Sequence, residues 1–149
     1  MNLDYKPPGP IAKSFMKDES FVRGIRGPVG SGKSVTCCME IMRKAVNQAP
    51  NSAGVRRTRW AVIRNTNPQL KTTTIKTWRD WFGDEVGKFV WSPPYTHLVN
   101  FSLPDKTSVE LEVIFLALDK QEDVKKLLSL ELTGVWLNEA RELPKSIVD

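Results

Sequence analysis

The stretch Gly27–Ser34 constrains the fold of this chain more than any other. It reads Gly-Pro-Val-Gly-Ser-Gly-Lys-Ser and fits the pattern G-x-x-x-x-G-K-[ST] of a P-loop. Its glycines let the backbone turn tightly and aim N–H groups at phosphate oxygens. Lys33 would place its charge on the β- and γ-phosphates, and the hydroxyl of Ser34 would bind the Mg²⁺ that bridges them. We therefore expect ATP and Mg²⁺ as ligands, with nucleotide contacts from Gly27, Pro28, Val29, Gly30, Ser31, Gly32, Lys33, Ser34 and Val35.

The residues on both sides of this stretch fit a phosphate-binding loop better than a glycine-rich turn without a ligand. Phe21–Ile25 predicts a short strand that enters the loop. From Ser34 to about Gln48 the apolar residues recur at helical spacing, and their stripe is wide enough for a helix packed on a sheet. The N-terminus of such a helix favours a bound anion through its free N–H groups and its dipole.

The rest of the chain predicts an α/β domain with a mainly parallel central sheet flanked by helices, plus a β-hairpin. Residues 60–64 read as a buried strand, and a helix should run from about residue 70 or 72 to 82. A short strand is expected at 88–91, hairpin arms at 97–102 and 108–116, a short helix capped by Asp119, and a strand at 135–137. Residues 1–20 should be irregular, because prolines occupy positions 7, 8 and 10. We expect a plain N-terminal arm there, the alternative being that Tyr5 or Phe15 stacks on a nucleotide base.

Composition indicates one soluble, intracellular domain. The 149 residues suit a single core, and no apolar run or N-terminal segment resembles a membrane span or a signal peptide. Cys37 and Cys38 are adjacent in the predicted helix, so core packing is favoured over a disulfide or a metal site. The lone histidine, His97, is expected to be a strand residue and not a catalytic base.

Charge is unevenly distributed along the chain. Residues 1–80 contain 15 lysines and arginines against 5 acidic residues, and residues 81–149 contain 7 against 12. The basic half would suit a polyanion such as nucleic acid, or the acidic half of a neighbouring copy in a ring. A solvated basic surface explains the same pattern.

A second group of candidate residues follows the predicted strand 135–137. Hydrolysis of a nucleoside triphosphate needs a group that orients Mg²⁺ and a base that positions the attacking water. An Asp-Glu pair commonly fills these roles at the end of a buried strand, and here the pair is Asn138-Glu139. Asn138 could hold a Mg²⁺-bound water through its carbonyl, and Glu139 would act as the base. The alternative is an ordinary acidic residue at a strand end.

Three segments together resemble the large terminase subunit of tailed bacteriophages. They are residues 27–34, residues 60–66 with Leu70, Thr73 and Thr74, and residues 134–144. In the last segment the Asn138-Glu139 pair, at the position of the family's acidic pair, is followed by a small residue and then by Pro144. The resemblance extends from about Phe15 to the end of the chain.

This resemblance implies an ASCE-type P-loop ATPase that moves double-stranded DNA into a procapsid through the portal. The implied partners are DNA, the portal and procapsid, the small terminase subunit and further copies of the chain in a ring, with no membrane. The implied location is the host cytoplasm during assembly and not the mature virion. Residues 1–149 would be a partial N-terminal ATPase domain, truncated after the Walker B strand, without the nuclease domain of the family.

By motif position, Lys33 and Ser34 correspond to Walker A, and Asn138 and Glu139 correspond to Walker B. Such motors also use an arginine from a neighbouring subunit to stabilise the transition state. Four arginines are candidates: Arg56, Arg64, Arg79 and Arg141. We select Arg64, because it ends a strand near the nucleotide side. A P-loop helicase or other DNA-remodelling ATPase remains the main alternative, and a P-loop kinase or a non-hydrolysing nucleotide-binding module is a third.

Overall fold

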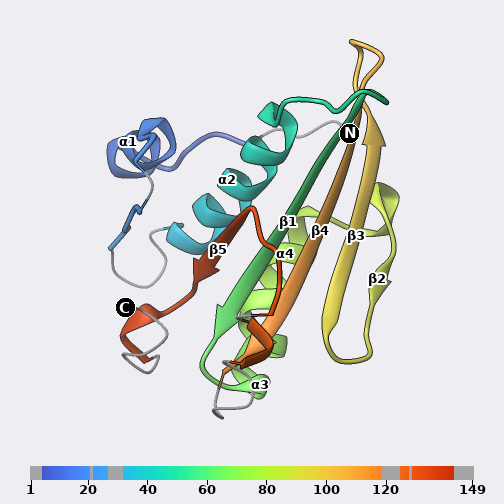
Figure 1. The fold of residues 1–149 in the computed structure, drawn as a ribbon. Helices are drawn as coiled ribbons and strands as arrows, with labels where there is room; N and C mark the ends of the chain where they lie inside the picture. The colour runs from blue at the N-terminus through green and yellow to red at the C-terminus, as the bar shows by residue number, and fades with distance from the viewer. Residues whose placement is uncertain (1–4, 21, 27–31, 119–124, 128, 143–149) are drawn as a thin grey trace.

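The structure is a computed structural model that describes residues 5–20, 22–26, 32–118, 125–127 and 129–142. Its described residues contain a five-stranded sheet of order β2-β3-β4-β1-β5 (Figure 1). The strands are β1 (Val55–Arg64), β2 (Phe89–Val90), β3 (Tyr95–Ser102), β4 (Ser108–Ala117) and β5 (Gly134–Leu137). The helices are α1 (Pro10–Lys17), α2 (Lys33–Asn47), α3 (Asn67–Gln69) and α4 (Lys76–Trp81), with a π-helical segment η1 (Leu70–Ile75) and the 3-10 turns η2 (Asp84–Val86) and η3 (Ala140–Glu142).

The sheet is mixed, although a mainly parallel sheet was expected. β1 pairs in parallel with β4 on one side and with β5 on the other. β3 pairs antiparallel with β4 and with β2. The hairpin explains this half of the sheet, because so short a connection between β3 and β4 can only join antiparallel neighbours. The α/β class and the flanking helices are confirmed.

The main core lies between the sheet and a layer formed by α2 and α4. Trp78, Phe82 and Phe115 are fully buried there. The apolar stripe of α2 faces this core as its spacing predicts, and five of its residues are buried: Cys38, Met39, Ile41, Met42 and Ala45. Cys37 and Cys38 are free thiols, and burial raises the pKa of Cys37 to about 12, so neither thiol is poised for reaction.

The opposite face of the sheet carries a smaller apolar cluster and a row of charges. Ala61, Ile63 and Leu118 are buried at the carboxyl end of this face. Nearer its start, Arg57 and Arg59 of β1 point the same way and pair with Glu110 and Glu112 of β4. The strand was predicted only from residue 60, but β1 begins at Val55, since these cross-strand ion pairs make an alternating charged face compatible with a strand.

The N-terminal third differs from two predictions. An α-helix, α1, forms where irregular chain was expected, because Pro10 occupies its first position, where a missing N–H costs no helical hydrogen bond. The strand predicted at Phe21–Ile25 is wrong for its described part, since residues 22–26 have no strand structure and the side chain of Val22 is exposed. Arg23 holds this segment to α1 by donating to the carbonyls of Phe15 and Asp18 at 2.7 Å each.

The predicted hairpin and final strand are confirmed as β3, β4 and β5. The helix predicted after residue 70 forms as η1 and α4. Asp119, the predicted cap of a short helix, lies outside the described residues, while residues 125–127 are helical. His97 is a buried residue of β3, as expected.

Candidate functional site

The candidate site lies at the carboxyl ends of β1 and β5. The chain leaves β1 toward the β2–β4 side of the sheet and later returns across β1 to form β5 on its other side (Figure 1). Ligands of open α/β sheets bind beyond the carboxyl ends of strands where the strand order reverses in this way. Arg64 ends β1 and Leu137 ends β5, so the residues that follow them lie at such a point.

The start of α2 supplies the described part of the P-loop. Gly32 caps the helix in a left-handed conformation with φ of 79°, and Lys33, Ser34 and Val35 form its first turn. A side chain at position 32 would meet the ring of Pro8, with a Cβ 2.8 Å from Cγ, so glycine is required by both backbone and packing. The first N–H groups of a helix have no carbonyl partner within it, which suits an anion. Gly27, Pro28, Val29, Gly30 and Ser31 lie outside the described residues.

Lys33 and Glu139 come together although 105 residues separate them in the chain. Lys33 Nζ lies 3.9 Å from Glu139 Oε1, and Arg141 Nε lies 3.6 Å from Glu139 Oε2. Glu139 has a positive φ of 55°, which is uncommon for a residue with a side chain. Such conformations cluster at functional sites, where the surrounding structure holds them.

Asn138, the neighbour of Glu139, is fixed by two hydrogen bonds. Its backbone N–H donates to the carbonyl of Ile63 at 2.9 Å, which continues the pairing of β5 with β1. Its side-chain Nδ2 donates to Thr74 Oγ1 at 2.7 Å. Asn138 and Thr74 are 6% and 1% exposed, so this contact lies in the interior. Thr74 carried part of the family resemblance, but nothing in the sequence assigned it this contact.

Arg64 lies next to this pair. Its Nη1 donates to Thr73 Oγ1 at 3.1 Å, so the consecutive threonines Thr73 and Thr74 contact the two strand ends. Two other arginine candidates lie elsewhere, since Arg56 pairs with Asp105 near the start of β1 and Arg79 pairs with Asp84 beyond α4. Arg141 is the candidate that contacts Glu139 directly.

The donor chemistry of the site fits Mg²⁺ held chiefly by phosphates and water. The described residues contain no group of three His, Cys, Asp or Glu side chains that would hold a metal ion by itself. Mg²⁺ in nucleotide sites usually takes only one or two protein ligands, all oxygen, and keeps several waters. Ser34 supplies a hydroxyl, Asn138 an amide oxygen and Glu139 a carboxylate, which are oxygen donors of this kind.

The N-terminal arm is held by its own contacts. Tyr5 Oη lies 3.0 Å from Thr36 Oγ1, and the Tyr5 ring packs edge-on against Trp81 with centroids 5.7 Å apart. Phe15 lies under the guanidinium of Arg23. Both aromatic side chains thus have protein partners, which agrees with a structural arm.

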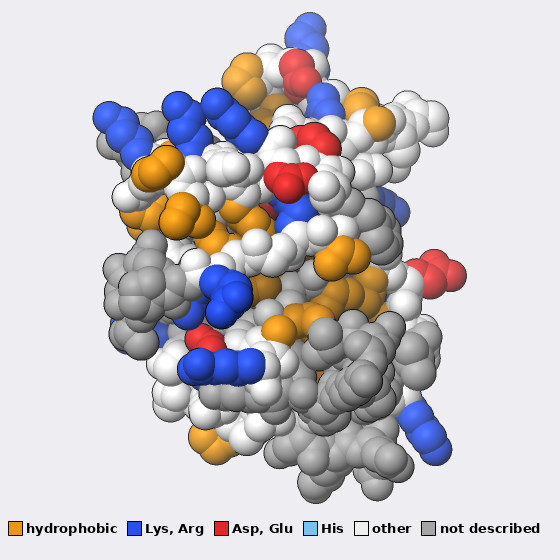
Figure 2. All heavy atoms as spheres, turned by 90° about the vertical axis from the view of Figure 1, so that its left-hand side faces the viewer, with side chains coloured by type: hydrophobic (Ala, Val, Ile, Leu, Met, Phe, Trp, Pro, Cys, Tyr) orange, Lys and Arg blue, Asp and Glu red, His pale blue; other side chains and the backbone are white. Residues whose placement is uncertain are grey.

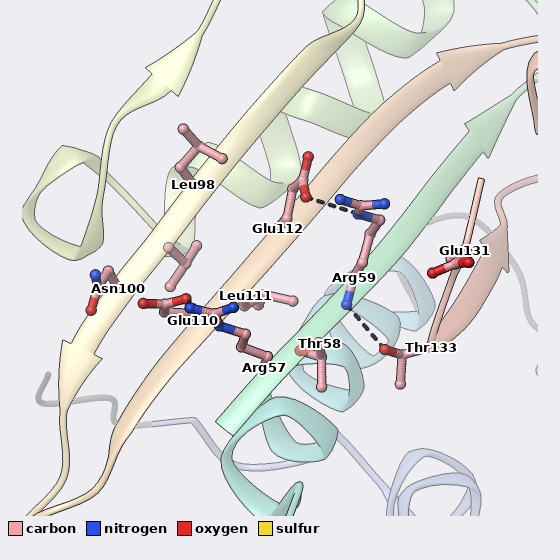
Figure 3. Close-up of a pocket in the computed structure, with 11 residues that line it drawn as sticks. Arg57, Thr58, Arg59, Leu98, Asn100, Glu110, Leu111, Glu112, Glu131 and Thr133 are labelled. Carbon is pink, nitrogen blue, oxygen red and sulfur yellow. Dashed lines mark hydrogen bonds and ion pairs between the residues drawn. The ribbon is translucent and has the colours of Figure 1, made fainter. Parts of the chain in front are cut away.

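A hollow of about 590 Å³ lies on the open face of the sheet, apart from the candidate site. Figure 3 shows that Arg57, Arg59, Glu110 and Glu112 project into it from β1 and β4, and that Arg59 N–H donates to Thr133 Oγ1. Each arginine pairs with a glutamate, and Glu131 also lines the hollow, so its lining has two basic and three acidic side chains. Nothing in its chemistry selects a ligand.

Many basic side chains of the first 80 residues have acidic partners. The pairs are Arg23–Glu40, Arg43–Glu40, Lys44–Glu19, Arg56–Asp105, Arg57–Glu110 and Arg59–Glu112. On the face that includes α1 and α2, Lys and Arg side chains lie at several separate places (Figure 2). Three of these pairs, Arg56–Asp105, Arg57–Glu110 and Arg59–Glu112, join the basic half of the sequence to its acidic half and offset part of the uneven charge locally.

Comparisons of the chain with known protein families, with characterised proteins and with solved structures found no match. None of the helices in the described ranges combines the length and apolar character needed to cross a bilayer. The functional interpretation therefore depends on the residues and geometry of this chain.

Proposed function

We propose that the chain binds ATP with Mg²⁺ and hydrolyses it. The observation that carries this proposal is the approach of Lys33 to Glu139 at 3.9 Å, between the first turn of α2 and the end of β5. A phosphate-binding lysine and a general base are expected in the same site, because one binds the γ-phosphate and the other the water that attacks it. The pairing also brings together two of the segments that carry the terminase resemblance.

Each residue would have a defined role in the reaction. Lys33 and the N–H groups of the first turn of α2 bind the phosphates and stabilise the charge that develops on the γ-phosphate. Glu139 orients the attacking water and accepts its proton. Ser34 and Asn138 would hold Mg²⁺, which when bound supplies positive charge between the β- and γ-phosphates. Arg64 stays our selection for the arginine that would stabilise the transition state in the site of a neighbouring copy.

Nucleotide binding and turnover test this proposal. Binding is titrated with a fluorescent ATP analogue, and hydrolysis is followed by phosphate release. We expect Lys33→Ala to weaken binding and abolish turnover, and Glu139→Gln to keep binding and lose turnover. Lys44→Ala is the matched control, because Lys44 lies on the same helix and its side chain is 33% exposed, against 29% for Lys33. Equal binding by wild type and Lys33→Ala would refute the assignment.

We further propose that this ATPase drives packaging of double-stranded DNA as part of a phage large terminase. The proposal rests on the three resembling segments, whose described residues lie around the ends of β1 and β5 and the start of α2. Portal, procapsid, small terminase subunit and a ring of copies are the partners it requires.

Packaging is measured by mixing the protein with procapsids, ATP and linear duplex DNA and scoring protection from added DNase. Protection that disappears with Lys33→Ala would support the packaging proposal. ATP-dependent strand separation without protection would overturn it in favour of a helicase.

A further inference from the structure

We propose that Thr74 is a positioning residue that sets the orientation of the Asn138 side chain toward the metal-bound nucleotide. This inference rests on the proposed ATPase function and adds a residue to which no role is assigned above. Thr74 lies on η1, between β1 and α4, and is distant in sequence from both motifs.

The contact between Thr74 and Asn138 is short, buried and specific. Asn138 Nδ2 donates to Thr74 Oγ1 at 2.7 Å, and both residues are almost fully excluded from solvent. In this arrangement Nδ2 is directed at Thr74, and removing the hydroxyl would leave a buried amide donor without that partner, which is costly. Because an amide group is planar, fixing its nitrogen also fixes the direction of Oδ1, the atom that can face a metal ion or its water.

An asparagine at this position has more need of such a partner than an aspartate. A carboxylate is drawn to Mg²⁺ by its charge and presents two equivalent oxygens, so either one serves. Asn138 is neutral and has one oxygen donor, so the wrong orientation presents an NH₂ group, which cannot bind a cation. Hydrogen bonds behind a ligand commonly supply this orientation in metal sites.

The local helix geometry supports a functional reason for the contact. η1 is a π-helical turn of six residues within a longer helical segment, and such turns are frequent at functional sites. On this turn Thr73 accepts from Arg64 and Thr74 accepts from Asn138. One turn of helix therefore contacts the ends of two neighbouring strands, each through a hydroxyl group.

The test compares Thr74→Ala with Thr74→Ser in the full chain. Both changes remove the methyl group, so the two variants differ by the hydroxyl oxygen alone. Thr72→Val is the control for side-chain changes on this turn, because Thr72 is exposed and its hydroxyl donates to the carbonyl of Pro68, one turn earlier in the same helical segment. The readouts are the Mg²⁺ concentration for half-maximal binding of a fluorescent ATP analogue, the kcat and KM of hydrolysis, and the melting temperature.

We expect Thr74→Ala to raise the half-saturating Mg²⁺ concentration by roughly tenfold, the lower end of effects seen when a partner of a metal ligand is removed. The kcat at low Mg²⁺ should fall in parallel, and excess Mg²⁺ should recover part of it. Thr74→Ser should stay within about threefold of wild type, since it keeps the hydroxyl. Thr74→Val, which keeps the volume but not the hydroxyl, should behave like Thr74→Ala and serves if the alanine variant does not fold.

The outcomes separate this inference from the proposed function. Wild type that shows no Mg²⁺-dependent ATP binding would overturn the proposed function itself. Wild type that binds and hydrolyses ATP, with Thr74→Ala and Thr74→Ser shifted equally or not at all, would overturn only the role of Thr74. A lowered melting temperature with unchanged Mg²⁺ dependence would also overturn it, because a purely structural hydrogen bond predicts that result.

Discussion

Replacing Gly134 by alanine tests the packing that sets β5, and with it the candidate site, against the rest of the sheet. Gly134 pairs with Trp60 of β1, and the indole ring of Trp60 lies over it. A Cβ at position 134 would lie 2.4 Å from Cζ3, 2.5 Å from Cη2 and 2.9 Å from Cε3 of that ring. Carbon atoms prefer separations of about 3.5–4.0 Å, so the ring would have to move by about 1 Å or more.

The expected cost follows from this overlap. Overpacking of this kind typically lowers the free energy of unfolding by about 1–3 kcal/mol. At about 2–4 °C for each kcal/mol in a domain near this size, the melting temperature should fall by about 2–12 °C. Thermal unfolding followed by circular dichroism measures it. Gly24→Ala is the control, since a Cβ there would meet nothing within 4 Å.

A double-mutant cycle with Trp60→Leu identifies the cause. Leucine removes the atoms that a Cβ at position 134 would strike, so Gly134→Ala should cost less than about 0.5 kcal/mol in the Trp60→Leu background. The difference between the two backgrounds is the energy of the clash. An equal loss in both backgrounds would show that Trp60 is not the obstacle and would refute the packing described here.

Two further predictions concern His97 and Asn138. The Nδ1 of His97 accepts a hydrogen bond from Trp78 Nε1, and burial lowers the pKa of His97 below its ordinary value. The neutral, buried imidazole therefore stabilises the fold fully above about pH 6.5. This contribution to the free energy of unfolding is lost as the pH falls toward the lowered pKa of the folded state. Urea unfolding at pH 7.5 and at pH 5.5 should show this loss, and His97→Gln, which cannot titrate, should show less of it. Asn138→Asp should lower the Mg²⁺ concentration for half-maximal ATP binding by roughly tenfold, because Mg²⁺ sites gain affinity with ligand charge, and an unchanged Mg²⁺ titration would argue against Asn138 as a metal ligand.

The elements predicted well are those whose pattern reflects local burial. The stripe of α2 and the alternation in β3 and β4 arise from which side chains face the core, and each is readable within eight to fifteen residues. The strand expected at Phe21–Ile25 shows the limit of this reasoning. Its apolar residues match a strand, but the described residues 22–26 form none. Arg23 instead donates to the carbonyls of Phe15 and Asp18, at the end of α1.

The candidate site likewise has residues that the sequence could identify and contacts that it could not. Lys33 and Glu139 could be assigned from motif order, because their chemistry requires fixed residue types at fixed spacing. The contact of Thr74 with Asn138 joins residues 64 positions apart and uses two side chains that are common in any sequence. The start of β1 at Val55 could not be predicted either. Arg57 and Arg59 look like loop residues in the sequence, and only the structure shows that they pair with Glu110 and Glu112 of β4.

The charges around Glu139 favour binding of a polyphosphate, as the proposed function requires. Lys33 and Arg141 both lie within 4 Å of the single carboxylate of Glu139, and Asn138 adds no negative charge. At 3.9 Å between partly exposed groups, the Lys33–Glu139 pair is worth only about 0–1 kcal/mol. A triphosphate that bound Lys33 through charge-assisted hydrogen bonds would gain more than this pair loses. If the proposed function holds, nucleotide binding would transfer Lys33 to the phosphates and leave Glu139 able to accept a proton from water.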